Sequence, residues 1–105
     1  MLQADPSRAL VIAALEERRA ALFGKMERFR DMGEAMCNLA NRLIDAGKLQ
    51  DAAKHLKQAR KVAEAHGFFS VECWACQGLG ALALAEGKHE EGIEMLRHAL
   101  TAVNP

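Results

Sequence analysis

The sequence predicts an all-α fold, an α-solenoid of antiparallel helix hairpins with about five helices. Apolar residues recur at steps of three and four, and no stretch alternates with the period of two that marks a strand. Single glycines divide the helical stretches, at Gly24, Gly47, Gly67 and Gly87. The segments 33–63 and 73–103 also repeat each other at an offset of 40 residues.

The composition excludes several classes of partner. The 105 residues carry 14 basic and 14 acidic side chains, and a formal net charge of zero argues against a general affinity for nucleic acid. The longest apolar run, Ala9 to Leu15, is too short to cross a membrane. No signal-peptide pattern opens the chain, and three cysteines favour reduced thiols. We therefore expect a cytoplasmic protein that binds neither nucleic acid nor membrane.

The N-terminal helix is expected to begin with Asp5 as its cap and Pro6 in its first turn. An apolar stripe then runs along the chain through Ile12, Leu15, Leu22, Met26, Phe29, Met36, Ala40 and Leu43. Two interpretations fit this stripe. Either one helix ends near Phe23 with Gly24 as its C-cap, or a single helix of roughly 60 Å spans 7–46. Two helices are favoured, because Gly24 resembles the helix-ending Gly67.

The middle of the chain predicts two further helices. The turn 45–48 contains Gly47 and opens a helix over 49–66, whose outer side is basic through Lys54, Lys57, Arg60 and Lys61. After Gly67, the pair Phe68 and Phe69 is expected to link to a helix over 71–86 that Ser70 caps.

Gly87 separates this helix from a last helix over 89–103. Its inward residues are expected to be Ile93, Leu96, Ala99 and Leu100. Glu90 and Glu91 fall in its first turn, where negative charge is favourable.

The internal repeat rests on positions that contact or turn in a helix hairpin. Six residues are identical between the copies: Ala35/Ala75, Leu39/Leu79, Gly47/Gly87, Lys48/Lys88, Leu56/Leu96 and Ala59/Ala99. Small residues also correspond, with Ala40 matching Gly80 and Ala52 matching Gly92. Small residues at such places predict that the two helices of each hairpin approach closely.

The repeated residues resemble the tetratricopeptide repeat, whose pattern is W-x2-L-G-x2-Y…A-x3-F…P. The first copy matches it with Met36, Leu39, Ala40, Leu43, Ala52, Leu56 and Ala59, and the second with Cys76, Leu79, Gly80, Ala83, Gly92, Leu96 and Ala99. The large aromatics of the pattern are missing. The period is 40 rather than about 34, which is similar to the long repeats of the Rapsyn, Pins/LGN and kinesin light chain group. The resemblance implies one domain over 1–105: an N-terminal helix or half repeat over 6–32, and repeats over 33–66 and 70–105.

The resemblance implies a protein-interaction module that holds a peptide or helix of a partner in a concave groove. The groove is expected to be lined by Glu34, Cys37, Asn41 and Asp45 on one helix and by Trp74, Gln77, Ala81 and Leu84 on the matching one. Asn41 is the strongest candidate, because grooves of this family use an Asn there. Trp74 is either an anchor for the ligand or a residue that fills the gap between hairpins.

A structural or oligomerisation role is the alternative. The steps of the N-terminal stripe resemble those of a coiled coil, so the stripe is a candidate for pairing with a second copy. Two and a half hairpins also leave apolar surface uncovered at the ends of the solenoid. This predicts either a fragment of a longer array or self-association, for instance as a homodimer.

No pattern points to an enzyme, a metal or another cofactor. Cys73 and Cys76 have the C-x-x-C spacing of redox and zinc sites, but no strand precedes them, and we expect small buried residues there. The four histidines, His55, His66, His89 and His98, share no metal-binding spacing. No phosphate-binding loop, nucleophile or paired carboxylates appear, so no catalytic residue is predicted.

Overall fold

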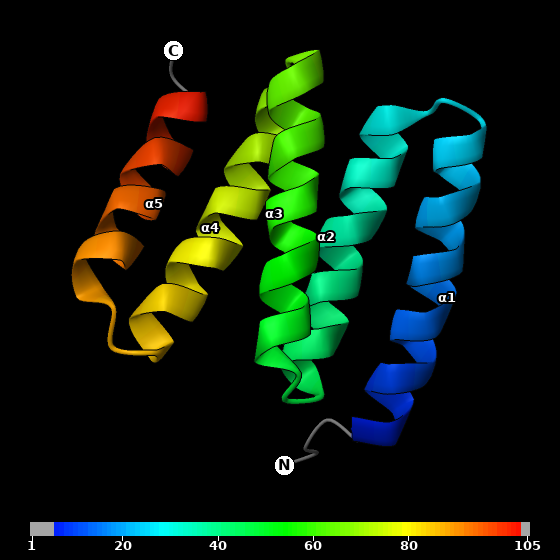
Figure 1. The fold of residues 1–105 in the computed structure, drawn as a ribbon, viewed down its shortest axis with the longest axis horizontal. Helices are drawn as coiled ribbons and strands as arrows, with labels where there is room; N and C mark the ends of the chain where they lie inside the picture. Colours follow the sequence, from blue (N-terminus) through cyan, green and yellow to red (C-terminus); the bar gives the residue numbers. More distant parts are fainter. Residues whose placement is uncertain (1–5, 104–105) are drawn as a thin grey trace.

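The computed structural model describes residues 6–103, and these residues form helices and turns without any strand. The helices are α1 (Pro6–Lys25), α2 (Phe29–Asp45), α3 (Leu49–His66), α4 (Phe69–Ala85) and α5 (His89–Val103). Consecutive helices run in opposite directions and lie side by side (Figure 1). Each packs against the next, and α2 also contacts α4. The molecule is a helical repeat of antiparallel hairpins, which confirms the predicted fold class.

The same turn joins all four consecutive pairs of helices. In each turn a backbone N–H donates to a carbonyl five residues earlier at 2.8–2.9 Å, and the pairs are Arg28–Phe23, Lys48–Leu43, Phe68–Ala63 and Lys88–Ala83. The residue before each donor has a left-handed backbone: Glu27 (φ 57°), Gly47 (φ 78°), Gly67 (φ 72°) and Gly87 (φ 79°). These positions recur every twenty residues, so each helix with its turn takes half of the 40-residue sequence period.

The first turn corrects one prediction. Two separate helices form, as favoured, but α1 continues through Gly24 to Lys25, and Glu27 is the left-handed residue. The prediction of Gly24 as a C-cap is wrong. A Cβ at Gly24 would lie 3.1 Å from the Met32 sulfur, so this glycine makes room for α2 instead of ending α1. The predicted cap Asp5 lies outside the described residues.

The start of α4 corrects a second prediction. The helix begins at Phe69, and its N-cap residue Phe68 makes no side-chain capping bond, so Ser70 lies in the first turn and is not the cap. The backbone turn at Gly67 already positions this helix start. The predicted bounds of α3 and α5, 49–66 and 89–103, agree with the structure.

The core lies along α2, α3 and α4, where small residues allow close approach. The backbones of α4 and α5 meet at Gly80 and Gly92, because a Cβ on either one would lie 3.1 Å from the other's carbonyl oxygen. Gly33 admits Val71 and Gly78 admits Leu56 in the same way. Ala40 and Ala52 have no exposed surface. The expectation of close approach at the small residues is confirmed at Gly80 and Gly92.

The outer face of α5 differs from the expectation. Ile93 and Leu100 were expected to point inward, but 48% and 69% of their surface is exposed. Ala99 is buried, and Met95 packs against the core in their place. The prediction failed because no described helix covers the far side of α5.

Among residues 6–103, no helix has both the length and the apolar character that crossing a membrane requires.

Candidate functional site

The predicted groove residues on α2 fall into two groups. Cys37 has no exposed surface, and burial, with a smaller contribution from Glu34, raises the pKa of its thiol to about 12. Cys37 is therefore a core residue, and its predicted place in an open groove is corrected. Glu34 is half-buried and faces α1, where it lines a cavity of about 50 Å³ with Arg19 and Phe23.

Asn41 and Asp45 remain accessible on α2. Asn41 is half-buried and Asp45 is exposed. Arg42 Nη2 forms an ion pair with Asp45 Oδ2 at 3.6 Å, so this carboxylate has a partner on its own helix. The Asn41 amide is the better placed of the two to bond the backbone of a peptide.

The predicted residues on α4 divide in the same way. Gln77 and Ala81 are exposed. Trp74 is half-buried and packs against the core cluster, as a residue that fills the gap between helices would. Leu84 packs toward α5, since its Cγ lies 2.7 Å from where a Cβ of Gly92 would be. The accessible predicted positions are therefore Asn41, Asp45, Gln77 and Ala81.

A surface that the groove prediction did not contain lies on the outer side of α1. Val11, Leu15, Leu22 and Met26, called here the α1 stripe, are 58–62% exposed. Met26 follows the last residue of α1, but its N–H still donates to the Leu22 carbonyl at 3.1 Å, so the helical spacing extends to it. At 100° per residue the four residues fall within about 60° of arc, so they form one continuous strip. The opposite side of the helix is buried against α2 through Ala9, Ala13 and Ala20. The longer predicted stripe is thus divided between surface and core, since Ala40 and Leu43 are buried.

A second surface is the basic side of α3. Lys54, Lys57 and Lys61 line an open groove of about 580 Å³ together with Lys88 and Glu86 from the turn between α4 and α5. Lys88 donates to Glu86 at 3.1 Å, and this hydrogen bond raises the pKa of the ammonium. Arg60 was expected on this face, but it turns aside toward α5 and contacts the Met95 sulfur at 3.5 Å.

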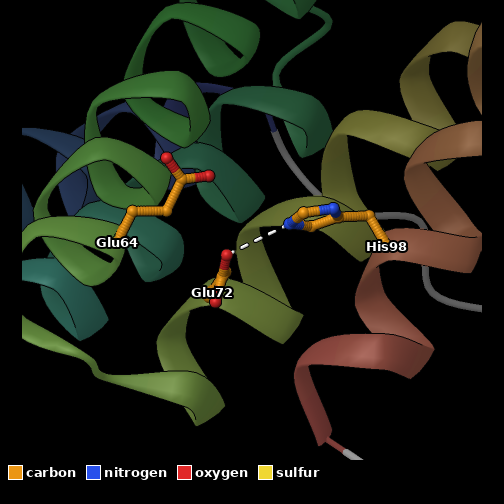
Figure 2. Close-up of side chains that lie close together, drawn as sticks. All are labelled: Glu64, Glu72 and His98. Atoms are coloured by element: carbon orange, nitrogen blue, oxygen red, sulfur yellow. Dashed lines mark hydrogen bonds and ion pairs between the residues drawn. The ribbon is translucent and has the colours of Figure 1, made fainter. Parts of the chain in front are cut away.

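The third feature is a cluster of side chains from three helices. Figure 2 shows Glu64 of α3, Glu72 of α4 and His98 of α5 pointing toward one another. His98 Nε2 lies 3.1 Å from Glu72 Oε1. Sequence reasoning missed this cluster, because the three residues come from different helices and have no local motif.

The C-x-x-C pair agrees with the sequence-based expectation at one of its two positions. Cys76 has no exposed surface, and burial is the largest cause that raises the pKa of its thiol. Cys73 is half-buried, and all three cysteines are free thiols. The expectation of a small buried residue is confirmed at Cys76.

Comparison with models of protein families, with curated proteins and with solved structures finds no match to this chain.

Proposed function

We propose that this chain is a protein-interaction module that pairs with a second copy of itself through the α1 stripe. The observation that carries the proposal is the orientation of α1, which directs alanines inward and Val11, Leu15, Leu22 and Met26 outward. A surface helix ordinarily does the reverse and buries its large apolar residues. Contiguous exposed apolar residues mark contact sites in soluble proteins.

The spacing of the α1 stripe suits a second copy as its partner. Two-fold symmetry requires a surface that complements itself. An antiparallel pair of α1 helices with its axis between residues 18 and 19 places Leu15 opposite Leu22 of the other copy. The same axis places Val11 opposite Met26 of the other copy. All four stripe residues then face an apolar residue across the dimer.

Sedimentation equilibrium over a concentration series tests this proposal. The wild type is expected to dissociate from dimer to monomer on dilution, and Leu22→Glu is expected to be monomeric throughout. Leu100→Glu is the matched control, because Leu100 is the same residue type and is also exposed, at 69% against 58% for Leu22, but lies on α5. A wild type that stays monomeric at high concentration would refute the proposal, as would a dimer that Leu100→Glu alone disrupts.

The second candidate is the binding of a peptide or helix in a groove, favoured by the accessible Asn41 and Gln77 amides. The resemblance to the tetratricopeptide repeat supports this candidate, since hairpins of that family present such side chains to ligands. Selection from a displayed peptide library tests it. The double variant Asn41→Ala, Gln77→Ala should lose the selected peptides, and binding at wild-type strength would count against the groove.

A cytoplasmic location is part of the proposal. It is supported by three free thiols, two of which are in the core. Disulfides are uncommon in the reducing cytosol, so such thiols suit that compartment.

A further inference from the structure

The geometry points to a binding site for a divalent transition-metal ion, with Zn²⁺ as the best match, between α3, α4 and α5. The ligands are Glu64, Glu72 and His98, whose ligand atoms all lie within 4.8 Å of one another. This site is separate from the proposed self-association, because α1 contacts α2 alone among the described helices.

The set of ligand atoms selects the class of metal. One imidazole nitrogen and two carboxylate oxygens suit Zn²⁺, whereas Mg²⁺ and Ca²⁺ prefer oxygen alone. Three protein ligands also leave a fourth position for water, as in many zinc sites with an open coordination position. The site is therefore expected to discriminate Zn²⁺ from Mg²⁺.

The distances are close to those of a metal site. Two ligands at about 2.1 Å from a tetrahedral ion are roughly 3.4 Å apart. His98 Nε2 and Glu72 Oε1, at 3.1 Å, nearly have this spacing already. Glu64 has to move by about 1–1.5 Å to join them, an estimate that follows from the same tetrahedral spacing. Its side chain is 46% exposed, so a rotamer change is open to it.

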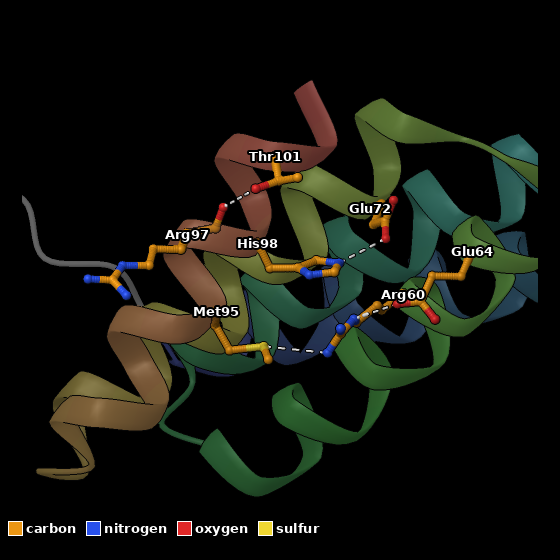
Figure 3. Close-up of polar contacts among 7 residues, drawn as sticks. All are labelled: Arg60, Glu64, Glu72, Met95, Arg97, His98 and Thr101. Carbon is orange, nitrogen blue, oxygen red and sulfur yellow. Dashed lines mark hydrogen bonds and ion pairs between the residues drawn. The ribbon is translucent and has the colours of Figure 1, made fainter. Parts of the chain in front are cut away.

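The surroundings hold Glu72 in place and put a positive charge beside the cluster. The Glu72 side chain is only 13% exposed where α4 faces its neighbours. Figure 3 shows Arg60 beside the cluster, between Glu64 and Met95, where its Nε donates to Glu64 at 2.8 Å. This bond holds Glu64 in its present position, so the move of Glu64 toward the other two ligands works against it. The guanidinium charge also opposes a nearby cation, so the expected affinity is moderate, with a Kd in the micromolar range.

Calorimetric titration of the full chain with ZnCl2 tests the site, together with thermal unfolding. One Zn²⁺ should bind per chain and raise the Tm, because an ion bound by the folded state alone stabilises it. MgCl2 should do neither. His98→Ala should weaken Zn²⁺ binding at least tenfold. His89→Ala is the matched control, since it makes the same change at the exposed start of the same helix and should bind as the wild type does.

Two further variants distinguish this site from Zn²⁺ binding at the C-x-x-C pair and from a general loss of the fold. Cys73→Ser should keep Zn²⁺ binding, which excludes the C-x-x-C pair as the ligand. Glu64→Gln alters an exposed residue, so it keeps the test valid if His98→Ala unfolds the chain, and it should also lose binding. A folded wild type that shows no heat and no Tm shift would overturn the proposal. So would binding that survives Glu64→Gln but disappears in Cys73→Ser.

Discussion

Glu27 is the one described residue other than glycine that has a positive φ. It occupies the turn position that Gly47, Gly67 and Gly87 occupy after α2, α3 and α4. A left-handed backbone costs an ordinary residue about 1–2 kcal/mol, because its Cβ approaches a carbonyl oxygen. The turn at Glu27 is therefore the strained member of four otherwise equal turns.

Replacing Glu27 with glycine should stabilise the fold by up to about 1 kcal/mol, since relief of strain exceeds the entropy that glycine adds to the unfolded chain. Urea unfolding measures the change. Gly67→Ala is the control with the opposite sign, about 1 kcal/mol destabilising. Nothing lies within 4 Å of a Cβ at Gly67, so only the backbone is tested there. A loss of stability in Glu27→Gly would contradict this account.

The Cys37 thiol predicts how stability depends on alkaline pH. Its pKa rises from 9.0 to about 12 in the fold, so between these values the unfolded chain loses a proton that the folded chain keeps. The contribution of this thiol to the free energy of unfolding is therefore fully present below pH 9. Above pH 9 the free energy of unfolding should fall by about 1.4 kcal/mol per pH unit. Urea unfolding from pH 8 to pH 10.5 measures the slope. Cys37→Ala should show a shallower slope, and an unchanged slope would contradict the role of this thiol.

At the scale of single residues, the sequence predicts the helix face on which a residue lies but not whether that face is buried. Cys37 and Gln77 are equivalent in the repeat, yet one is fully buried and the other exposed. The neighbours of the two helices differ, because α2 is contacted by α4, two helices later, and no described helix stands in that relation to α4. Periodicity places a residue on a face, but it does not show whether another helix covers that face.

Among the elements, α1 is the helix whose sequence and packing disagree most. Its apolar period is regular, but the fold buries the alanines of that period and leaves the larger residues outside. Arg18 lies on the same side as the α1 stripe, near its centre, and is exposed. In the proposed antiparallel pair, the Arg18 side chains of the two copies lie near the two-fold axis and repel each other.

Arg18→Gln should therefore tighten self-association about tenfold, which corresponds to about 1.4 kcal/mol. Glutamine removes the charge without adding an apolar group, so a gain reflects repulsion and not general hydrophobic association. Analytical ultracentrifugation gives the dimer Kd, and added salt should tighten the wild-type dimer more than the variant. Lys25→Gln, at the end of α1, serves as the charge-matched control. Weaker association in Arg18→Gln would place the axis elsewhere.

Element boundaries were predictable where glycine marks them and not elsewhere. The bounds of α3 and α5 follow from Gly47, Gly67 and Gly87, each of which is left-handed as its position requires. The end of α1 and the start of α4 were misassigned, because Gly24 serves packing and Ser70 has no capping role. In both cases a glycine or serine was taken as a capping residue, whereas the backbone turn between the helices sets the boundary.

For the whole molecule, the order of contacts predicts a gradient of local stability. The helices α2, α3 and α4 form the middle, while α1 packs against α2 alone and α5 packs mainly against α4, with a side-chain contact from Arg60 of α3 to Met95. In such linear arrays each unit is stabilised by its immediate neighbours, so the ends open most easily. The middle helices should therefore carry most of the protection against local opening.

Hydrogen exchange should show this gradient. The amides of α1 and α5 are expected to exchange faster than those of α3, when followed by mass spectrometry of peptides. Leu22→Glu should speed exchange in α1 if a second copy covers it, and α5 provides the internal control that should not change. Equal protection along the whole chain would contradict the gradient.

At this largest scale the sequence predicted the architecture and named the N-terminal stripe as a candidate for self-association, but it did not predict the cluster or which stripe residues are exposed. The 40-residue repeat was sufficient for hairpins in series, because equivalent residues make equivalent contacts. The cluster of Glu64, Glu72 and His98 depends on three helices meeting, and the α1 stripe depends on which side α2 covers. Both are properties of the assembled fold, which the order of residues along the chain does not display.

The identical turns at every twentieth residue carry a consequence for how such a chain can lengthen. One added unit of twenty residues would reverse the direction of every later helix and turn its buried side outward. Two added units, as in a duplication of 49–88, restore the direction of the later helices. The second copy would then follow the Gly87 turn in the way that the first copy follows the equivalent Gly47 turn. Growth by gene duplication would thus preserve the geometry only in even steps, and an engineered chain can be extended at any of the four turns by the same rule.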